Sequence, residues 1–136
     1  MYKVLGILMI GICCQVLARP VVVKTKTQEV VFDVREATTA PQRAKGLQHV
    51  KSLPEKGGML FLFEKPTIPV FWMKDTFIPL DMIFFTQGGE IVQIEPDCVP
   101  FSEENIPAKV PVIGVLEIGG GLAEKYHIRL GDTLTF

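Results

Sequence analysis

The chain has 136 residues, with 14 basic and 15 acidic side chains and a formal net charge of −1. Charges of both signs are scattered along the sequence, and no basic patch indicates nucleic acid as a partner. No repeat, long low-complexity segment or linker divides the chain, so its length predicts one domain with a single hydrophobic core.

The first eighteen residues have the pattern of a secretory signal peptide. Lys3 supplies the positive start, residues 4–18 form a charge-free apolar run, and Val16 and Ala18 suit cleavage before Arg19. This run of 15 residues is shorter than the ~20 residues that a membrane-spanning helix needs. We therefore expect an exported protein, periplasmic or secreted, with its signal peptide at 1–18. An uncleaved membrane anchor is the alternative.

Cleavage at that point would leave a single domain of 118 residues, 19–136, with a net charge of −2 because Lys3 is removed. Two of the three cysteines would leave with the signal, so Cys98 would stand alone and could not form an internal disulfide. The mature domain would then depend on its core for stability. We expect a monomer that has no stable insertion in a membrane.

Short apolar runs cut by glycine and proline dominate the rest of the chain, and this punctuation favours β-strands. Some runs alternate apolar and polar residues, as half-exposed strands do, and others are apolar on both faces, as in strands buried between layers. A hairpin is predicted at Gln87-Gly88-Gly89, because paired glycines supply the positive φ angles of tight turns. In chain order, the predicted strands are 30–34, 59–63, 80–86, 90–94, 112–118 and 132–136, and a further extended stretch ends at 71–73.

Helix signals are few and short. Thr39 and Gln42 have the spacing of a capping box, and Gly46 provides a stop, so at most two turns fit there. Residues 121–127 contain good helix formers and predict a second short helix. Seven or so strands with one or two short helices predict a mainly β fold, either a compact antiparallel β-sandwich or a partly open barrel.

Several ordered motifs resemble the domain of unknown function 192 family. They are RAKGL at 43–47, GMLFLF at 58–63, FWMKDT at 71–76 with IPLD at 78–81, and VLEI at 115–118 with GD at 131–132. The resemblance extends from about residue 30 to residue 136, and four ordered motifs with similar gaps make it specific. It implies a compact, mainly β domain that occurs in bacteria and archaea, often behind a signal peptide. The activity of that family has no settled description.

This chain departs from the usual pattern of that family at two positions. Asp75 stands where the family usually has an asparagine, and Gln48 stands where a methionine usually follows the Gly-Leu pair. The first departure matters because it replaces a neutral amide, which both donates and accepts hydrogen bonds, with a negative charge that only accepts them.

The segment 71–85, FWMKDTFIPLDMIFF, carries the candidate site. Charged groups in so apolar a run are costly to bury unless they are paired or hydrogen-bonded. Pro79 fixes a bend, so residues 74–78 are expected to connect the end of one extended stretch to the start of the next strand.

Two interpretations of this connection remain open. In one, Asp75 and Thr76 bond the backbone of the turn, and Lys74 is solvated or pairs with Asp75. In the other, the turn borders a pocket for a small ligand, in which Trp72 offers a flat apolar face and Lys74, Asp75 and Thr76 offer directional polar contacts. We take these four residues as the candidate ligand-binding residues.

Two further acids, Asp81 and Glu117, stand in predicted strands among strong hydrophobic residues. Each must either face solvent or be buried with a partner. Arg43 is the predicted partner, because a guanidinium group holds a carboxylate through two hydrogen bonds. We expect these three residues to lie behind the ligand-binding residues and support them.

The sequence favours binding over catalysis, and the expected ligand is a small sugar-like or peptide-like molecule or another envelope component. One alternative is a cell-envelope carbohydrate hydrolase that uses two of Asp75, Asp81 and Glu117 as acid and base. Another is an accessory module that recognises a protein through the same loop. We predict no catalytic residue, no cofactor and no metal, since calcium-loop spacing and paired histidines are lacking. Asp97 beside Cys98 disfavours a thiolate nucleophile.

Overall fold

The computed structural model describes residues 18–136, so the predicted signal peptide lies outside the described residues except for Ala18. This part of the chain forms nine strands and two short helices. Within it, no helix combines the length and the apolar character needed to cross a membrane. The elements in chain order are β1 (Arg19–Lys24), β2 (Glu29–Ala37), α1 (Ala40–Lys45), β3 (Gly57–Thr67), β4 (Val70–Phe71), β5 (Leu80–Phe85), β6 (Ile91–Cys98), β7 (Ile106–Pro107), β8 (Val112–Gly119), α2 (Leu122–Lys125) and β9 (Thr133–Thr135).

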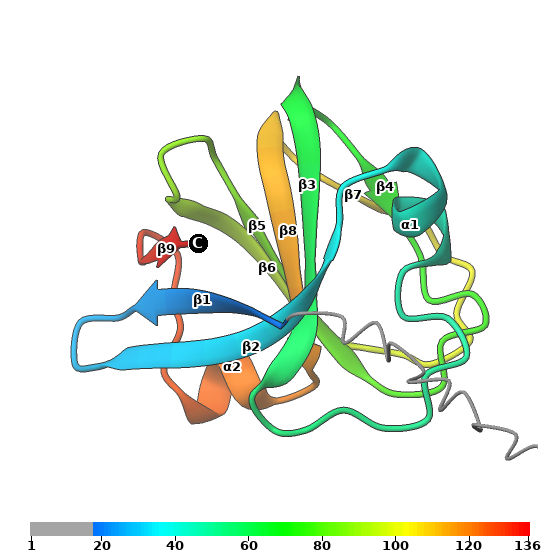
Figure 1. The fold of residues 1–136 in the computed structure, drawn as a ribbon, viewed down its shortest axis with the longest axis horizontal. Coiled ribbons are helices and arrows are strands. Elements are labelled where there is room, and N and C mark those ends of the chain that lie inside the picture. Colours follow the sequence, from blue (N-terminus) through cyan, green and yellow to red (C-terminus); the bar gives the residue numbers. More distant parts are fainter. Residues whose placement is uncertain (1–17) are drawn as a thin grey trace, which may run out of the picture.

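Seven of the strands form one curled sheet (Figure 1), in the order β6-β5-β8-β3-β2-β1-β9. The pair β2 and β3 is parallel and the other neighbours in this sheet are antiparallel. At one end the curl brings β9 back to the start of β6, where the Leu134 N–H donates to the Gly89 carbonyl at 2.8 Å. The expectation of a mainly β, partly open barrel is confirmed, and β4 and β7 add a small second sheet.

Local sequence signals account for the turns and for the first helix. Thr39 and Gln42 form the predicted capping box at the start of α1. In the turn between β5 and β6, Gly89 has a φ of 85°, and a Cβ there would lie 2.2 Å from the carbonyl oxygen of Leu134. Glycine is therefore required at this position both by the turn and by the close approach of β9.

Both faces of the sheet are apolar, which explains why β8 reads as a continuous hydrophobic run. Leu116 and Ile118 pack into a core on one face, together with α2. Val115 packs into a second core on the opposite face, together with residues of β4 and β7. Because side chains alternate along a strand, Glu117 points to this second face.

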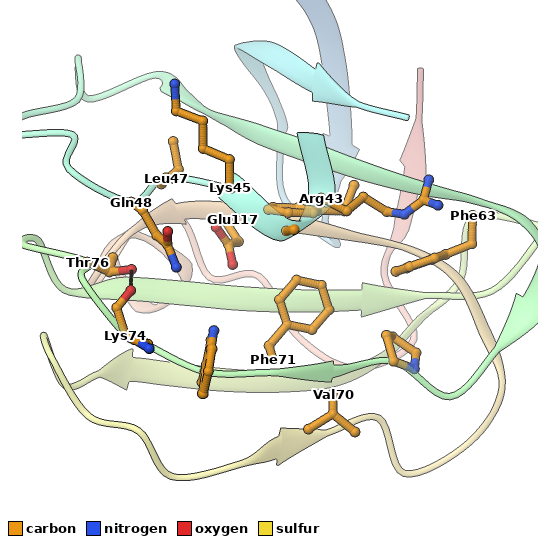
Figure 2. A pocket seen from close by; sticks show the side chains of 15 residues that line it. Arg43, Lys45, Leu47, Gln48, Phe63, Val70, Phe71, Lys74, Thr76 and Glu117 are labelled. Atoms are coloured by element: carbon orange, nitrogen blue, oxygen red, sulfur yellow. Dashed lines mark hydrogen bonds between the residues drawn. The ribbon is translucent and has the colours of Figure 1, made fainter. Parts of the chain in front are cut away.

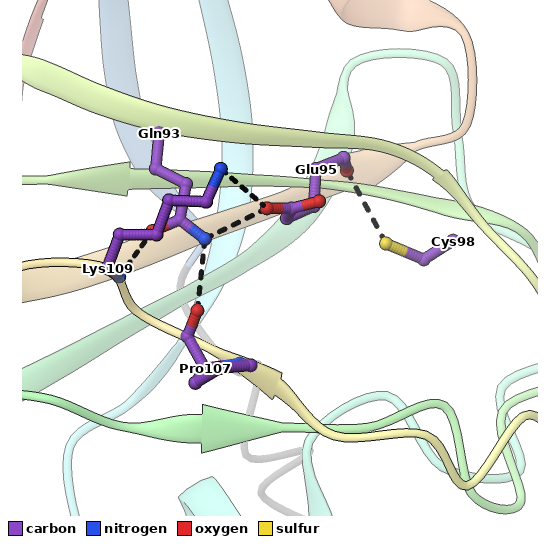
Figure 3. A network of polar contacts seen from close by, with 5 residues as sticks. All are labelled: Gln93, Glu95, Cys98, Pro107 and Lys109. Atoms are coloured by element: carbon purple, nitrogen blue, oxygen red, sulfur yellow. Dashed lines mark hydrogen bonds and ion pairs between the residues drawn. The ribbon is translucent and has the colours of Figure 1, made fainter.

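A polar network holds the small sheet against β6 (Figure 3). The Gln93 amide donates to the Pro107 carbonyl at 3.1 Å and to Glu95 at 3.0 Å, and it accepts from the Lys109 N–H at 2.8 Å. Gln93 is buried, so its amide fixes the position of β7. Since β7 pairs with β4, the network also fixes the strand that carries Phe71.

Candidate functional site

A pocket of about 250 Å³ lies on the second face of the sheet, bordered by α1, β3, β4 and the loop that follows β4. Figure 2 shows it from close by, with Gln48, Lys74 and Thr76 toward one end, Phe63 toward the other, and Glu117 and Phe71 between them. The aromatic residues that line it are Phe61, Phe63, Phe71 and Trp72. It therefore combines a broad apolar surface with a few polar groups, as sites for small molecules do.

Arg43 fixes the helix side of the pocket and, within residues 18–136, forms no ion pair with an acid. Its Nη1 donates to the Thr38 carbonyl at 2.7 Å and to the Leu62 carbonyl at 2.9 Å. Its guanidinium also lies over the ring of Phe63, with Cζ 5.2 Å from the ring centroid. The predicted pairing of Arg43 with Asp81 or Glu117 is wrong, because backbone carbonyls and an aromatic ring take up its side chain and tie α1 to β3.

Glu117 is the buried acid of this pocket. It lies in the middle of the sheet, where β8 pairs it with Met59 of β3 and with Met82 of β5. Its side chain is 4% exposed, and it forms no hydrogen bond or ion pair with any residue of 18–136. Burial raises the pKa of its carboxyl to about 8. At neutral pH the group is therefore mostly protonated, and it can donate a hydrogen bond.

The loop after β4 brings three of the four predicted ligand-binding residues to the pocket. Trp72, Lys74 and Thr76 line it. Trp72 is 45% exposed, and the Lys74 ammonium lies 5.2 Å from the centroid of its ring. The Thr76 hydroxyl donates to the Lys74 carbonyl at 3.0 Å, as expected of a turn residue. The loop thus supplies an accessible aromatic face with a cation beside it.

Asp75, the fourth predicted residue, does not line the pocket. Its φ of 51° lies in the left-handed region, and its carbonyl accepts a hydrogen bond of 2.9 Å from the His49 N–H. Aspartate and asparagine both tolerate this conformation better than most residues do. The asparagine expected from the family resemblance and the aspartate present here therefore both suit this backbone, and Asp75 joins the loop after β4 to the loop after α1.

Asp81 supports α2 and lies on the opposite face of the sheet from Glu117. One carboxylate oxygen accepts from the N–H groups of Asp97 at 2.8 Å and Gly121 at 3.0 Å, and the other accepts from the Ala123 N–H at 2.8 Å. Three backbone donors compensate its complete burial. Asp81 is therefore a structural acid outside the pocket, and it does not support the ligand-binding residues directly.

A family model described as Uncharacterized ACR, DUF192, matches residues 21–136. The chain belongs to the DUF192 family. Two solved structures resemble this family member along most of its length. One is a protein of unknown function from Novosphingobium aromaticivorans DSM 12444, with 38% identity, a TM-score of 0.86, and coverage of 88% of this chain and 85% of that chain.

The other is a protein of Sinorhizobium meliloti 1021 named as a candidate transcription regulator. It has 33% identity to this DUF192 chain, a TM-score of 0.84, and coverage of 85% of this chain and 91% of that chain. Among curated proteins, none matches.

Sequence reasoning missed several residues of the pocket in this DUF192 domain. Lys45 and Gln48 line it from α1 and from the loop after it, and Phe61, Phe63 and Phe71 line it from strands. The RAKGL motif contains Lys45 and directly precedes Gln48, and the motifs GMLFLF and FWMKDT contain the three phenylalanines, but membership of a motif does not separate pocket residues from core residues. Glu117 is the single acid that lines the pocket, and among the described residues no cluster of three or more acids, histidines or cysteines could hold a metal ion.

Proposed function

We propose that this DUF192 protein is an exported domain that binds a small organic ligand in the Glu117 pocket. The observation that carries the proposal is the Glu117 carboxyl, which is buried, faces the pocket and has no partner within residues 18–136. Within residues 18–136, no side-chain nitrogen or oxygen is both fully buried and without a partner, so the Glu117 carboxyl opens onto the pocket. A ligand that bonds the carboxyl there would form a hydrogen bond in a largely desolvated position, which gives the pocket affinity for something outside the chain.

The other walls of the pocket support binding over hydrolysis. Trp72 is accessible and has space beside it, as the binding interpretation requires. A glycoside hydrolase needs two carboxylates that flank one bond. Asp81 is engaged by three backbone amides on the other face, and Asp75 serves a turn, so Glu117 has no acid beside it in the pocket.

The partner that we propose is a small molecule and not nucleic acid. Binding to nucleic acid requires a basic patch or stripe that neutralises phosphates. The chain has a net charge of −1. Its similarity to a Sinorhizobium protein named as a regulator gives no evidence of such a basic surface on this chain. Aromatic walls with a few polar groups suit a ring-containing fragment, such as a sugar or a peptide-like molecule.

A ligand screen by thermal unfolding tests the proposal. The library contains saccharides, short peptides and small cyclic acids and amides, and each is added to wild type, Trp72→Ala and the control Phe101→Ala. Phe101 is exposed like Trp72 but lies outside the pocket. A true ligand raises the Tm of wild type and Phe101→Ala by several degrees near saturation and leaves Trp72→Ala unchanged. A library without any such compound, or a shift that persists in Trp72→Ala, contradicts the proposal.

Export rests on the N-terminal pattern of Lys3 followed by the apolar run 4–18. Expression of the full chain in a bacterium, followed by fractionation and N-terminal sequencing, tests this part separately. The expected result is a periplasmic or secreted protein that begins at Arg19. An intact N-terminus in the membrane fraction would support the anchor, and recovery in the cytoplasm would refute export.

A further inference from the structure

The charges around the pocket differ from those of the whole protein. Three basic residues line it, Arg43, Lys45 and Lys74, against the single acid Glu117, whereas the chain as a whole has a net charge of −1. None of these cations forms an ion pair within residues 18–136. At neutral pH Glu117 is mostly uncharged, because burial raises its pKa to about 8. The lining of the pocket therefore carries a net positive charge on a slightly acidic protein, although the exposed Lys45 side chain points away from the other labelled residues (Figure 2).

Hydrogen-bond donors without partners are gathered toward one end of this pocket. Gln48 and Lys74 lie there, with Glu117 between them and the apolar end (Figure 2). Within residues 18–136, the Gln48 amide and the Glu117 carboxyl form no hydrogen bond, and the Lys74 ammonium forms no hydrogen bond or ion pair and lies 5.2 Å from the centroid of the Trp72 ring. A protonated carboxyl, an amide NH₂ and an ammonium can all donate to the same acceptor.

The other end of the pocket is mainly aromatic, with the Arg43 guanidinium as its charged group. Phe71 lies in the middle of the pocket, and its ring packs edge-on against Phe61 at 5.1 Å and against Phe84 at 5.9 Å. Phe63 follows toward the far end, where the Arg43 guanidinium covers its ring (Figure 2). Aromatic rings held in this way offer edge and face contacts to a ring of the ligand.

From these contacts we infer that the ligand is a small organic acid, whose carboxylate is received by Glu117, Gln48 and Lys74 and whose ring or other apolar body lies along Phe71 toward Phe63. This inference rests on the proposed function and specifies its ligand. Bonds from an ammonium and a carboxylic acid to a carboxylate are charge-assisted, and they are about twice as strong as neutral ones.

Other ligand charges fit the same contacts less well. An amine would place a second cation beside Lys74 and would gain nothing from the other two cations. An uncharged amide or sugar could bond Gln48 and Glu117, but it would leave the positive charge of the pocket without a counterpart. A carboxylate satisfies the donors and the charge together.

Three probes with the same phenyl ring and chain separate these possibilities, namely 3-phenylpropanoate, 3-phenylpropanamide and 3-phenylpropylamine. Trp72 is the one tryptophan of the chain and lines the pocket, so its fluorescence reports occupancy without a label. At pH 7 we expect the acid to bind about tenfold more tightly than the amide, because a charge-assisted bond is about twice as strong as a neutral one, and we expect the amine to bind most weakly.

Two lysine variants test where the carboxylate binds. Lys74→Met should weaken 3-phenylpropanoate about tenfold and bring it close to the amide. The control Lys51→Met removes the same charge from an exposed lysine outside the pocket and should change affinity less than about twofold. Both titrations are repeated by calorimetry, because Lys74 lies against the fluorescent ring.

The outcomes distinguish this inference from the proposed function. If the amide or the amine binds as tightly as the acid, the organic acid is excluded while ligand binding by the pocket stands. Equal affinity of 3-phenylpropanoate for wild type and Lys74→Met would refute the assigned carboxylate position. If none of the three probes binds to folded protein, the inference is overturned, and the thermal screen with its uncharged compounds still decides on the pocket itself.

Discussion

Replacing Glu117 with glutamine should remove a loss of stability that develops as the pH rises. Burial raises the pKa of the Glu117 carboxyl to about 8 in the folded protein, from the ordinary value of 4.5. Between these two values the folded protein binds more protons than the unfolded chain does. The free energy of unfolding therefore falls with increasing pH across this window. Below the window Glu117 has no effect on it, and above pH 8 the full penalty of ionising Glu117 has been incurred.

The size of the effect follows from the interval between the two pKa values. Each pH unit within the window costs ~1.4 kcal/mol, so the full penalty above pH 8 is about 5 kcal/mol, and about 3 kcal/mol is already lost at pH 7. A domain of this size is usually stable by only about 5–15 kcal/mol. Ionised Glu117 would therefore remove a large share of the stability of the protein.

Urea unfolding at pH 5, 7 and 9, followed by the fluorescence of Trp72, measures this penalty. Glutamine keeps the shape of the side chain but does not ionise, so Glu117→Gln should gain about 4 kcal/mol over wild type between pH 5 and pH 9. All other titrating groups cancel in that comparison. Glu124→Gln, at an exposed acid of α2, is the matched control and should follow wild type at every pH. A gain that is the same at pH 5 and pH 9 would refute the raised pKa of Glu117.

Three other features give testable expectations. Asp81→Asn should lower the free energy of unfolding by about 2–4 kcal/mol in chemical denaturation, because an amide cannot accept from all three backbone donors, and a loss below 1 kcal/mol would contradict the structural role of this acid. Burial, with Glu95 nearby, raises the pKa of the Cys98 thiol to about 11, so native protein should react with iodoacetamide at pH 8 far more slowly than urea-unfolded protein does. Equal rates would show that the thiol is accessible. Gln93→Leu should destabilise by about 1–3 kcal/mol, as it leaves the Pro107 carbonyl and the Lys109 N–H without partners, and hydrogen exchange should increase first in β7.

The parts of the fold that sequence predicted are those with local causes. The capping box of α1 uses residues three apart, and the turn between β5 and β6 needs a glycine with positive φ at Gly89. The alternation in β2 and the double-sided apolar run of β8 depend only on which faces are buried. Each of these signals lies within about ten residues of chain.

The parts that sequence did not predict depend on distant segments. The strand β1 pairs with both β2 and β9, and the parallel pair of β2 and β3 joins strands separated by α1 and a long loop. The two-residue strands β4 and β7 are too short to leave a periodic pattern. Arg43 shows the same limit for a side chain, because its partners are the carbonyls of Thr38 and Leu62, and backbone carbonyls have no sequence signature.

Asp81 and Glu117 are the sharpest case, since the two acids look alike in sequence and differ completely in the fold. Both are buried in strands of the same sheet. Asp81 accepts hydrogen bonds from three backbone N–H groups, whereas Glu117 forms no hydrogen bond within residues 18–136. A leucine at position 117 would avoid the cost of placing a carboxyl in this largely desolvated position. Because proteins store such costs mainly where a site needs them, the unpaired acid at the pocket indicates a role outside the fold itself. Asp81 has its hydrogen-bond partners within the fold, whereas the Glu117 carboxyl is the acid whose hydrogen bonds a ligand would supply.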